Sequence, residues 1–170
     1  MQRRLCLTII SASAMSALPG CGFALRKAPS FAFKTLFSPL AESSSLGIEL
    51  KRSLESNGNV QVVTDPRQID KAEVILDVLQ EQREKVVVGL NASGQVREFQ
   101  LRLRFKFKLR SAKNSELIPL TEILQQRDIS FNESAVLAKE TEEALLYREM
   151  QSDIIQQIMR RLATVTFNKI

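Results

Sequence analysis

The sequence predicts an α/β protein of the α+β two-layer type, in which two helices pack on one face of a mixed sheet of four to five strands. Three observations support this class. Segment 31–64 has the pattern strand, helix, strand; segment 73–131 alternates apolar and polar residues over long stretches; and segment 134–163 repeats apolar residues at helical spacing. A period of two indicates a strand, whereas steps of three and four indicate an amphipathic helix. Because two helices cover only one face, we expect the other face to meet water or a partner.

The first part of the predicted domain is a strand–helix–strand unit. Phe31 and Phe33 alternate within segment 31–37, which we expect to be a strand, and the β-branched run 60–64 predicts a second strand. A helix is expected between them, from about residue 44 to residue 57. Its signals are leucines at every fourth position and serines that can cap its start: Leu46, Leu50 and Leu54, and Ser43, Ser44 and Ser45. This order predicts a βαβ-like beginning.

Three long strands follow in the middle of the chain. Segments 73–90 and 95–111 are joined by Asn-Ala-Ser-Gly, a turn composition that predicts an extended hairpin. Segment 117–131 is the next predicted strand. The second strand of the hairpin contains LRLRFKFKLR (101–110), in which every odd position is apolar and every even position is basic.

The last predicted element is a long helix over 134–163. Its apolar residues step by three or four positions and form one stripe: Tyr147, Met150, Ile154, Ile158, Leu162 and Val165. Acids are frequent in its early turns (139–143) and bases in its late turns (159–161), which matches the helix dipole. We expect the stripe to face the sheet.

The N-terminus predicts a lipoprotein signal peptide over 1–20. Arg3 and Arg4 precede an uncharged apolar segment, 5–18, which is shorter than the roughly 20 residues that a membrane-spanning helix requires. The following Leu-Pro-Gly-Cys resembles a bacterial lipobox, in which the cysteine, here Cys21, is lipidated and becomes the mature N-terminus. The proline departs from the small residue usual at its position. The alternative is a short buried helix that ends at Pro-Gly.

We therefore divide the chain into a signal peptide (1–20), a lipidated tether (21–30) and a single domain (31–170). Cys21 is expected to carry a diacylglycerol and an acyl chain such as palmitate. By resemblance to enterobacterial lipoproteins, the glycine after this cysteine favours the outer membrane, with the protein anchored in its inner leaflet on the periplasmic side. Cleavage removes two of the 24 basic residues and none of the 19 acidic ones, so the net charge falls from +5 to +3.

The composition argues against an enzyme and against a cofactor or metal site. The chain has no histidine, the usual proton carrier at neutral pH and a common metal ligand. Its two cysteines, Cys6 and Cys21, are assigned to the signal and to the lipid, so no disulfide, thiol nucleophile or cysteine-rich metal site is expected. No phosphate-binding or dinucleotide-binding glycine motif is present. Apart from the lipid on Cys21, we expect no cofactor and no catalysis.

The bases of 101–110 have two interpretations. One is an ordinary one-sided strand, apolar toward the helices and charged toward water, with Glu81, Glu84 and Glu98 near the bases. This does not explain why all five outward residues are basic, so a polyanionic partner is a reasonable addition. Nucleic acid fits poorly, because the two phenylalanines share the leucine face and the protein is exported. Phosphorylated glycolipids, above all lipopolysaccharide (LPS), fit better because Lys and Arg bind phosphate.

The order of these parts resembles the LptE family of LPS-assembly lipoproteins. The resemblance is carried by CGFALR at the cysteine, by NASGQVREFQLRLRFKF over the hairpin, and by RDISFNESAVLAKETEEALLYREM before the last helix. It implies an outer-membrane lipoprotein of Gram-negative bacteria that faces the periplasm. Such a protein plugs the β-barrel of LptD, helps to assemble it, and binds LPS during insertion into the outer leaflet without catalysing a reaction. The fold it implies is the same two-layer arrangement.

The resemblance also implies an LPS site. The lysine of the family's LAK segment, an LPS contact, matches Lys139, whereas the second basic contact of the family lies at a hairpin tip that has no base here. Arg97 or Arg102 can substitute from the strand, and Arg104 and Lys106 extend the expected LPS-binding set. For Lys139 alone the other interpretation is a solvated lysine near a helix start. The alternative function is a periplasm-facing lipoprotein that acts as a scaffold for another envelope complex and does not bind LPS.

Overall fold

The computed structural model describes residues 29–167, apart from the side chains of residues 57 and 58. The signal peptide (1–20), Cys21 and most of the tether (21–30) lie outside the described residues. In chain order the elements are β1 (Thr35–Phe37), α2 (Ser45–Gly58), β2 (Gln61–Val63), a 3₁₀ helix (Pro66–Lys71), β3 (Val74–Leu90), β4 (Val96–Ser111), β5 (Glu116–Ser130), a second 3₁₀ helix (Glu133–Ala135) and α3 (Val136–Ala163).

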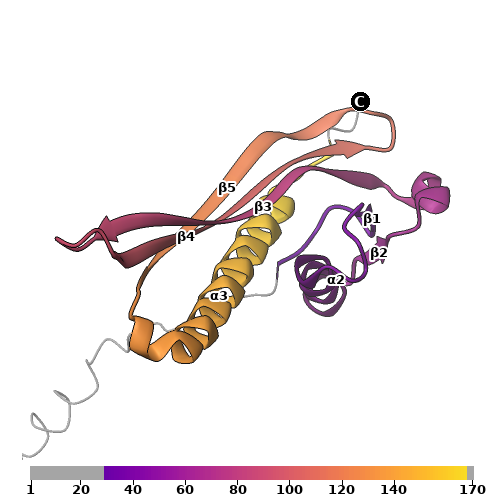
Figure 1. The fold of residues 1–170 in the computed structure, drawn as a ribbon. Coiled ribbons are helices and arrows are strands. Elements are labelled where there is room, and N and C mark those ends of the chain that lie inside the picture. The colour runs from indigo at the N-terminus through magenta and orange to yellow at the C-terminus, as the bar shows by residue number, and fades with distance from the viewer. Residues whose placement is uncertain (1–28, 168–170) are drawn as a thin grey trace, which may run out of the picture.

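The five strands form one mixed sheet in the order β2-β1-β3-β4-β5, as Figure 1 shows. β1 is parallel to both of its neighbours, β2 and β3, while β3, β4 and β5 are antiparallel. Parallel neighbours need a crossover connection, and α2 supplies it between β1 and β2. The predicted βαβ-like beginning and the extended hairpin are therefore both confirmed.

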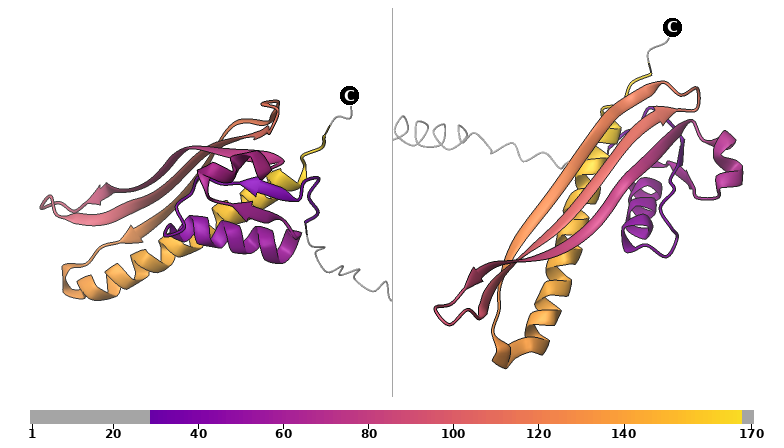
Figure 2. Two further views of the ribbon diagram at one scale, coloured as in Figure 1. Left: turned by 90° about the vertical axis from the view of Figure 1, so that its right-hand side faces the viewer. Right: turned by 45° about the horizontal axis from the view of Figure 1, so that its top comes forward.

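Helices α2 and α3 pack on the same face of the sheet (Figure 2). The predicted leucines of α2 are buried, as is the α3 stripe from Met150 onward, with Tyr147 half-buried at its beginning. These residues pack against the apolar face of β4, where Leu101, Phe105 and Phe107 have no exposed surface. The two-layer α+β architecture is confirmed.

The ends of the elements have local causes. The Ser44 hydroxyl accepts a hydrogen bond from the Gly47 N–H at 3.4 Å, so one of the predicted serines is the N-cap of α2. Asn59 ends the helix in the left-handed region, with φ at 51°. In the β3–β4 turn, Gly94 has φ at 77°, a conformation that glycine adopts without strain.

Two features differ from the sequence prediction. β1 begins at Thr35 rather than at residue 31, because its partners offer only short ladders of three residues on β2 and two on β3. The outer face of the sheet is also covered at one end. The 3₁₀ helix Pro66–Lys71 contributes Ile69 to a small apolar cluster that the sequence reading missed: Phe37, Val63, Ala72 and Ile75.

Within residues 29–167, none of the helices combines the length and the apolar character needed to cross a membrane.

Candidate functional site

The even-numbered residues of β4 form a single basic face, which we call the basic row: Arg102, Arg104, Lys106, Lys108 and Arg110. Each is half-buried, while the odd-numbered residues between them are buried against the helices. The alternation that defines a one-sided strand is thus confirmed. The basic row lies on the face of the sheet that α2 and α3 do not cover.

Two carboxylates bind four of these bases. Glu122, opposite Lys106 on β5, lies 2.5 Å from Arg104 and 3.1 Å from Lys106. Hydrogen bonding from Lys106 is the main reason that the pKa of Glu122 is lowered, and the charge of Arg104 adds to it. On the other side of β4, Asp77 lies 2.9 Å from Arg110 and 3.8 Å from Lys108. The basic row is therefore partly neutralised by its own sheet.

The acids expected near the basic row are placed differently from one another. Glu84 stands opposite Arg102, and Glu98 lies on the same face, beyond Gln100, which accepts a hydrogen bond from Arg102 at 2.8 Å. The expectation for Glu81 is wrong. A register shift between Val78 and Gln80 places Glu81 opposite Phe105, on the helix side of the sheet. Sequence reasoning missed Asp77 and Glu122 because their pairing depends on strand register.

The other predicted LPS residues lie elsewhere. Lys139, near the start of α3, donates hydrogen bonds to Ser130 at 3.0 Å and to Glu142 at 2.8 Å. Arg97 has an exposed side chain near the start of β4, and its carbonyl accepts a hydrogen bond from the N–H of Phe131, next to Ser130. Its odd position directs it to the face opposite Arg102. The structure therefore separates Arg97 and Lys139 from Arg102, Arg104 and Lys106.

Sequence reasoning also missed Lys85, a second basic residue that lies beside Lys139. The Lys85 ammonium binds Glu143 at 2.6 Å and lies 4.4 Å from the centre of the Phe99 ring. The two lysines border a small cavity of about 70 Å³ between the sheet and the first turns of α3. Its remaining walls are mostly apolar or acidic: Phe99, Ile129, Ser130, Phe131, Val136, Glu140 and Glu143.

The end of the molecule that contains this cavity also carries exposed apolar side chains. At this end the β3–β4 hairpin extends past β5 (Figure 1). We call this region the hairpin end. Leu137 is 81% exposed, and the other exposed members are Val87, Val88, Leu90 and Val136. Bases next to exposed apolar groups suit a ligand that has both anionic and hydrocarbon parts.

Within the part of the chain that the structure describes, no cluster of three or more His, Cys, Asp or Glu residues is arranged to hold a metal ion. Burial, and the charge of Glu143, raise the pKa of Tyr147, whose hydroxyl donates a hydrogen bond to the Glu84 carbonyl at 2.8 Å. This contact joins α3 to β3.

Comparison with solved structures gives three informative matches. A solution structure of uncharacterized lipoprotein B from Nitrosomonas europaea is 34% identical, with a TM-score of 0.70 over 84% of this chain and 90% of that one. Crystal structures of rare lipoprotein B from Shewanella oneidensis and of a minor lipoprotein from Acinetobacter baumannii, each 23% identical, share the fold. Their TM-scores are 0.61 and 0.60, covering 76% and 78% of this chain and 94% and 92% of theirs. No curated protein matches.

The family comparison covers nearly all of the fold. The model of the family described as "LptE: Lipopolysaccharide-assembly" matches residues 33–162, from just before β1 to the last turn of α3. Members of this family are non-enzymatic lipoproteins, independent of a cofactor. With this match and the 34% identity over most of both chains, this protein belongs to the LptE family of lipopolysaccharide-assembly proteins.

Proposed function

We propose that this chain is an outer-membrane lipoprotein, anchored through Cys21, that plugs and helps to assemble an LptD-type barrel. We further propose that it binds LPS during insertion into the outer leaflet. The observation that carries the proposal is the family match over residues 33–162. The architecture of the sheet is consistent with the proposal. Helices α2 and α3 bury one face, and the basic row lies on the other face, where a partner can reach it.

The hairpin end is the LPS contact that the geometry supports best. It combines Lys139 and Lys85 with Val136, a 40% exposed side chain that lines the same cavity, so a phosphate and an acyl chain could bind side by side. Arg97 has an exposed side chain at the same end of β4. Arg102, Arg104 and Lys106 form a secondary contact, because they lie on the other face of the sheet, away from this cavity, and Glu122 binds two of them.

Photocrosslinking in cells tests both halves of the proposal. A photoreactive residue is placed at Leu137 in the hairpin end or at Leu124, which stands opposite Arg104 on the outer face. Crosslinks are blotted separately for the barrel protein and for LPS. We expect LPS from Leu137 and the barrel from Leu124.

Absence of both LPS and the barrel protein would favour the second candidate function, a periplasm-facing scaffold for another envelope complex that does not bind LPS. Absence of LPS alone would contradict only the LPS contact. The pairing of the basic row with Glu122 and Asp77 is the observation that favours this candidate, because a self-paired surface suits contact with protein. Failure to recover any barrel protein would contradict the plug itself.

A further inference from the structure

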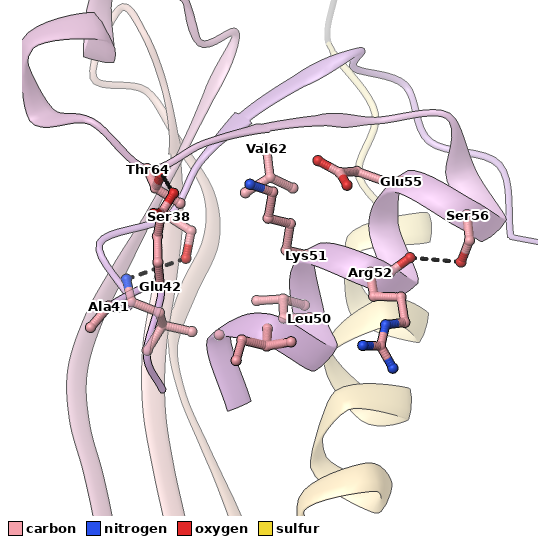
Figure 3. A pocket seen from close by; sticks show the side chains of 13 residues that line it. Ser38, Ala41, Glu42, Leu50, Lys51, Arg52, Glu55, Ser56, Val62 and Thr64 are labelled. Carbon is pink, nitrogen blue, oxygen red and sulfur yellow. Dashed lines mark hydrogen bonds between the residues drawn. The ribbon is translucent and has the colours of Figure 1, made fainter. Parts of the chain in front are cut away.

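A groove lies at the opposite end of the sheet from the hairpin end. It is enclosed by α2, β2 and the segment 38–42 that leads from β1 into α2, and it has a volume of about 650 Å³ (Figure 3). Leu40, Leu50 and Val62 form its floor and are at most 8% exposed. Gly47 keeps one wall narrow, because a Cβ there would lie 2.8 Å from the Ala41 carbonyl oxygen. The groove is apolar inside and open to solvent.

The free edge of β2 runs along this groove. Gln61 donates its N–H to the Lys34 carbonyl at 2.8 Å, and Val63 accepts from the Ser38 N–H at 2.9 Å, so both residues face β1. Successive residues of a strand direct their backbone groups to alternate sides, so the N–H and C=O of Val62 point away from β1 at the edge of the sheet. Among residues 29–167, leaving aside the side chains of residues 57 and 58, no loop, helix or side chain forms a hydrogen bond with either group.

The opposite edge of the sheet is protected in a way that β2 is not. On β5, Phe131 faces β4 through its N–H, so the even-numbered residues direct their backbone groups to the free edge. There Arg127 donates to the Gln126 carbonyl at 2.9 Å and is held by Asp153 of α3 at 2.8 Å. This contact covers one carbonyl of the β5 edge. Among the described side chains, none bonds to Val62 on the β2 edge in a comparable way.

We propose that an extended segment of a partner polypeptide adds to the free edge of β2 and places one apolar side chain in the groove. The Val62 N–H and C=O require an acceptor and a donor at the spacing of a peptide backbone, which a hydrocarbon chain cannot supply. The lining contains two bases, Lys51 and Arg52, and two acids, Glu42 and Glu55, so its charges cancel in sum and the segment needs no net charge. This site is distinct from the hairpin end and does not depend on the proposed LPS contact.

The test uses the full chain in nanodiscs and random nonapeptides displayed on phage. The most enriched peptide is synthesised and titrated, and amide hydrogen exchange is measured residue by residue. We expect the Val62 amide to exchange at least about tenfold more slowly at saturation, because a peptide carbonyl accepts its hydrogen. The Gln61 amide, which is already bonded to β1, should not change.

Two matched variants locate the peptide. Ile48→Glu, at a groove residue that is 45% exposed, should weaken binding about tenfold, because it places a carboxylate beside the apolar side chain. Leu124→Glu, at an outer-face leucine that is 39% exposed, should leave binding unchanged. Both positions are exposed, so both variants are expected to fold.

Several results would overturn the proposal. It is wrong if no peptide is enriched, if a bound peptide leaves Val62 exchange unchanged, or if Ile48→Glu has no effect. Perturbation of Leu50 and Val62 by dodecylphosphocholine, but by no peptide, would assign the groove to an acyl chain instead. Protection of Val62 that grows with protein concentration alone would assign the edge to a second copy of this chain.

Discussion

The basic row and the hairpin end hold their positive charges in different ways. On the outer face, Glu122 and Asp77 each contact two bases, so the charge is shared within β3, β4 and β5. At the hairpin end, Lys139 and Lys85 also have acidic partners, but they border one small cavity together with Val136, which is 40% exposed. The number of bases in a strand therefore does not locate an anion site. The neighbours of each base decide whether a phosphate gains anything by binding.

The largest effect is expected on the free energy of unfolding, from a core substitution beneath the basic row. Phe105→Ala removes a ring with no exposed surface and leaves a cavity between β4 and the helices, so we expect the free energy of unfolding to fall by about 3–5 kcal/mol. Phe99→Ala, at the half-buried ring of the hairpin end, should cost less than half as much. Urea denaturation of both variants measures the difference. Equal losses would show that the hairpin end is as firmly packed as the centre of the sheet.

The next largest effect is expected on the affinity for LPS. Lys139→Glu replaces a base with an acid beside Glu142, and we expect LPS affinity to fall about tenfold, which corresponds to 1.4 kcal/mol. Arg104→Glu should reduce affinity by less than about threefold, because Glu122 already competes with phosphate for Arg104. Binding is measured by LPS titration of each variant, with circular dichroism as the control for folding. A larger loss in the Arg104 variant would move the site to the basic row.

A smaller effect is expected from charge reversal inside the basic row. Glu122→Lys places a third base beside Arg104 and Lys106, and we expect the free energy of unfolding to fall at low salt. Added salt should recover most of this loss, because these side chains are partly exposed and the repulsion is screened. Glu122→Gln is the neutral control. A loss that persists at high salt would indicate disrupted packing instead of repulsion.

Most of the fold could be predicted because periodicity decides it locally. The leucines of α2 and the alternation in β4 each fix a buried face without knowledge of the partner strand. The position of Glu81 could not be predicted in the same way, because one extra residue at the bulge near Leu79 reverses the face of the residues after it, up to the next register shift at Val87.

The candidate site was predicted less completely for a related reason. Lys139 and Arg97 could be named from a family resemblance, yet their distance from Arg102 follows from the end of β5 and the start of α3. Nothing in the sequence marked Lys85 as a site residue, because a lysine is ordinary in a strand that contains both polar and apolar residues. Its contact with the Phe99 ring and with Glu143 exists only after the hairpin and the helix pack together.

The smallest predicted effect is a pH dependence of stability at the basic row. Because Lys106 and Arg104 lower the pKa of Glu122 below its ordinary value of 4.5, the folded state holds this proton less tightly than the unfolded chain. The resulting stabilisation is present above pH 4.5 and is lost as the pH falls through the lowered pKa. The stability difference between the native chain and Glu122→Gln should therefore shrink on acidification below this point, as measured by urea unfolding. A difference that does not change with pH would contradict the coupling between this carboxylate and the bases of the outer face.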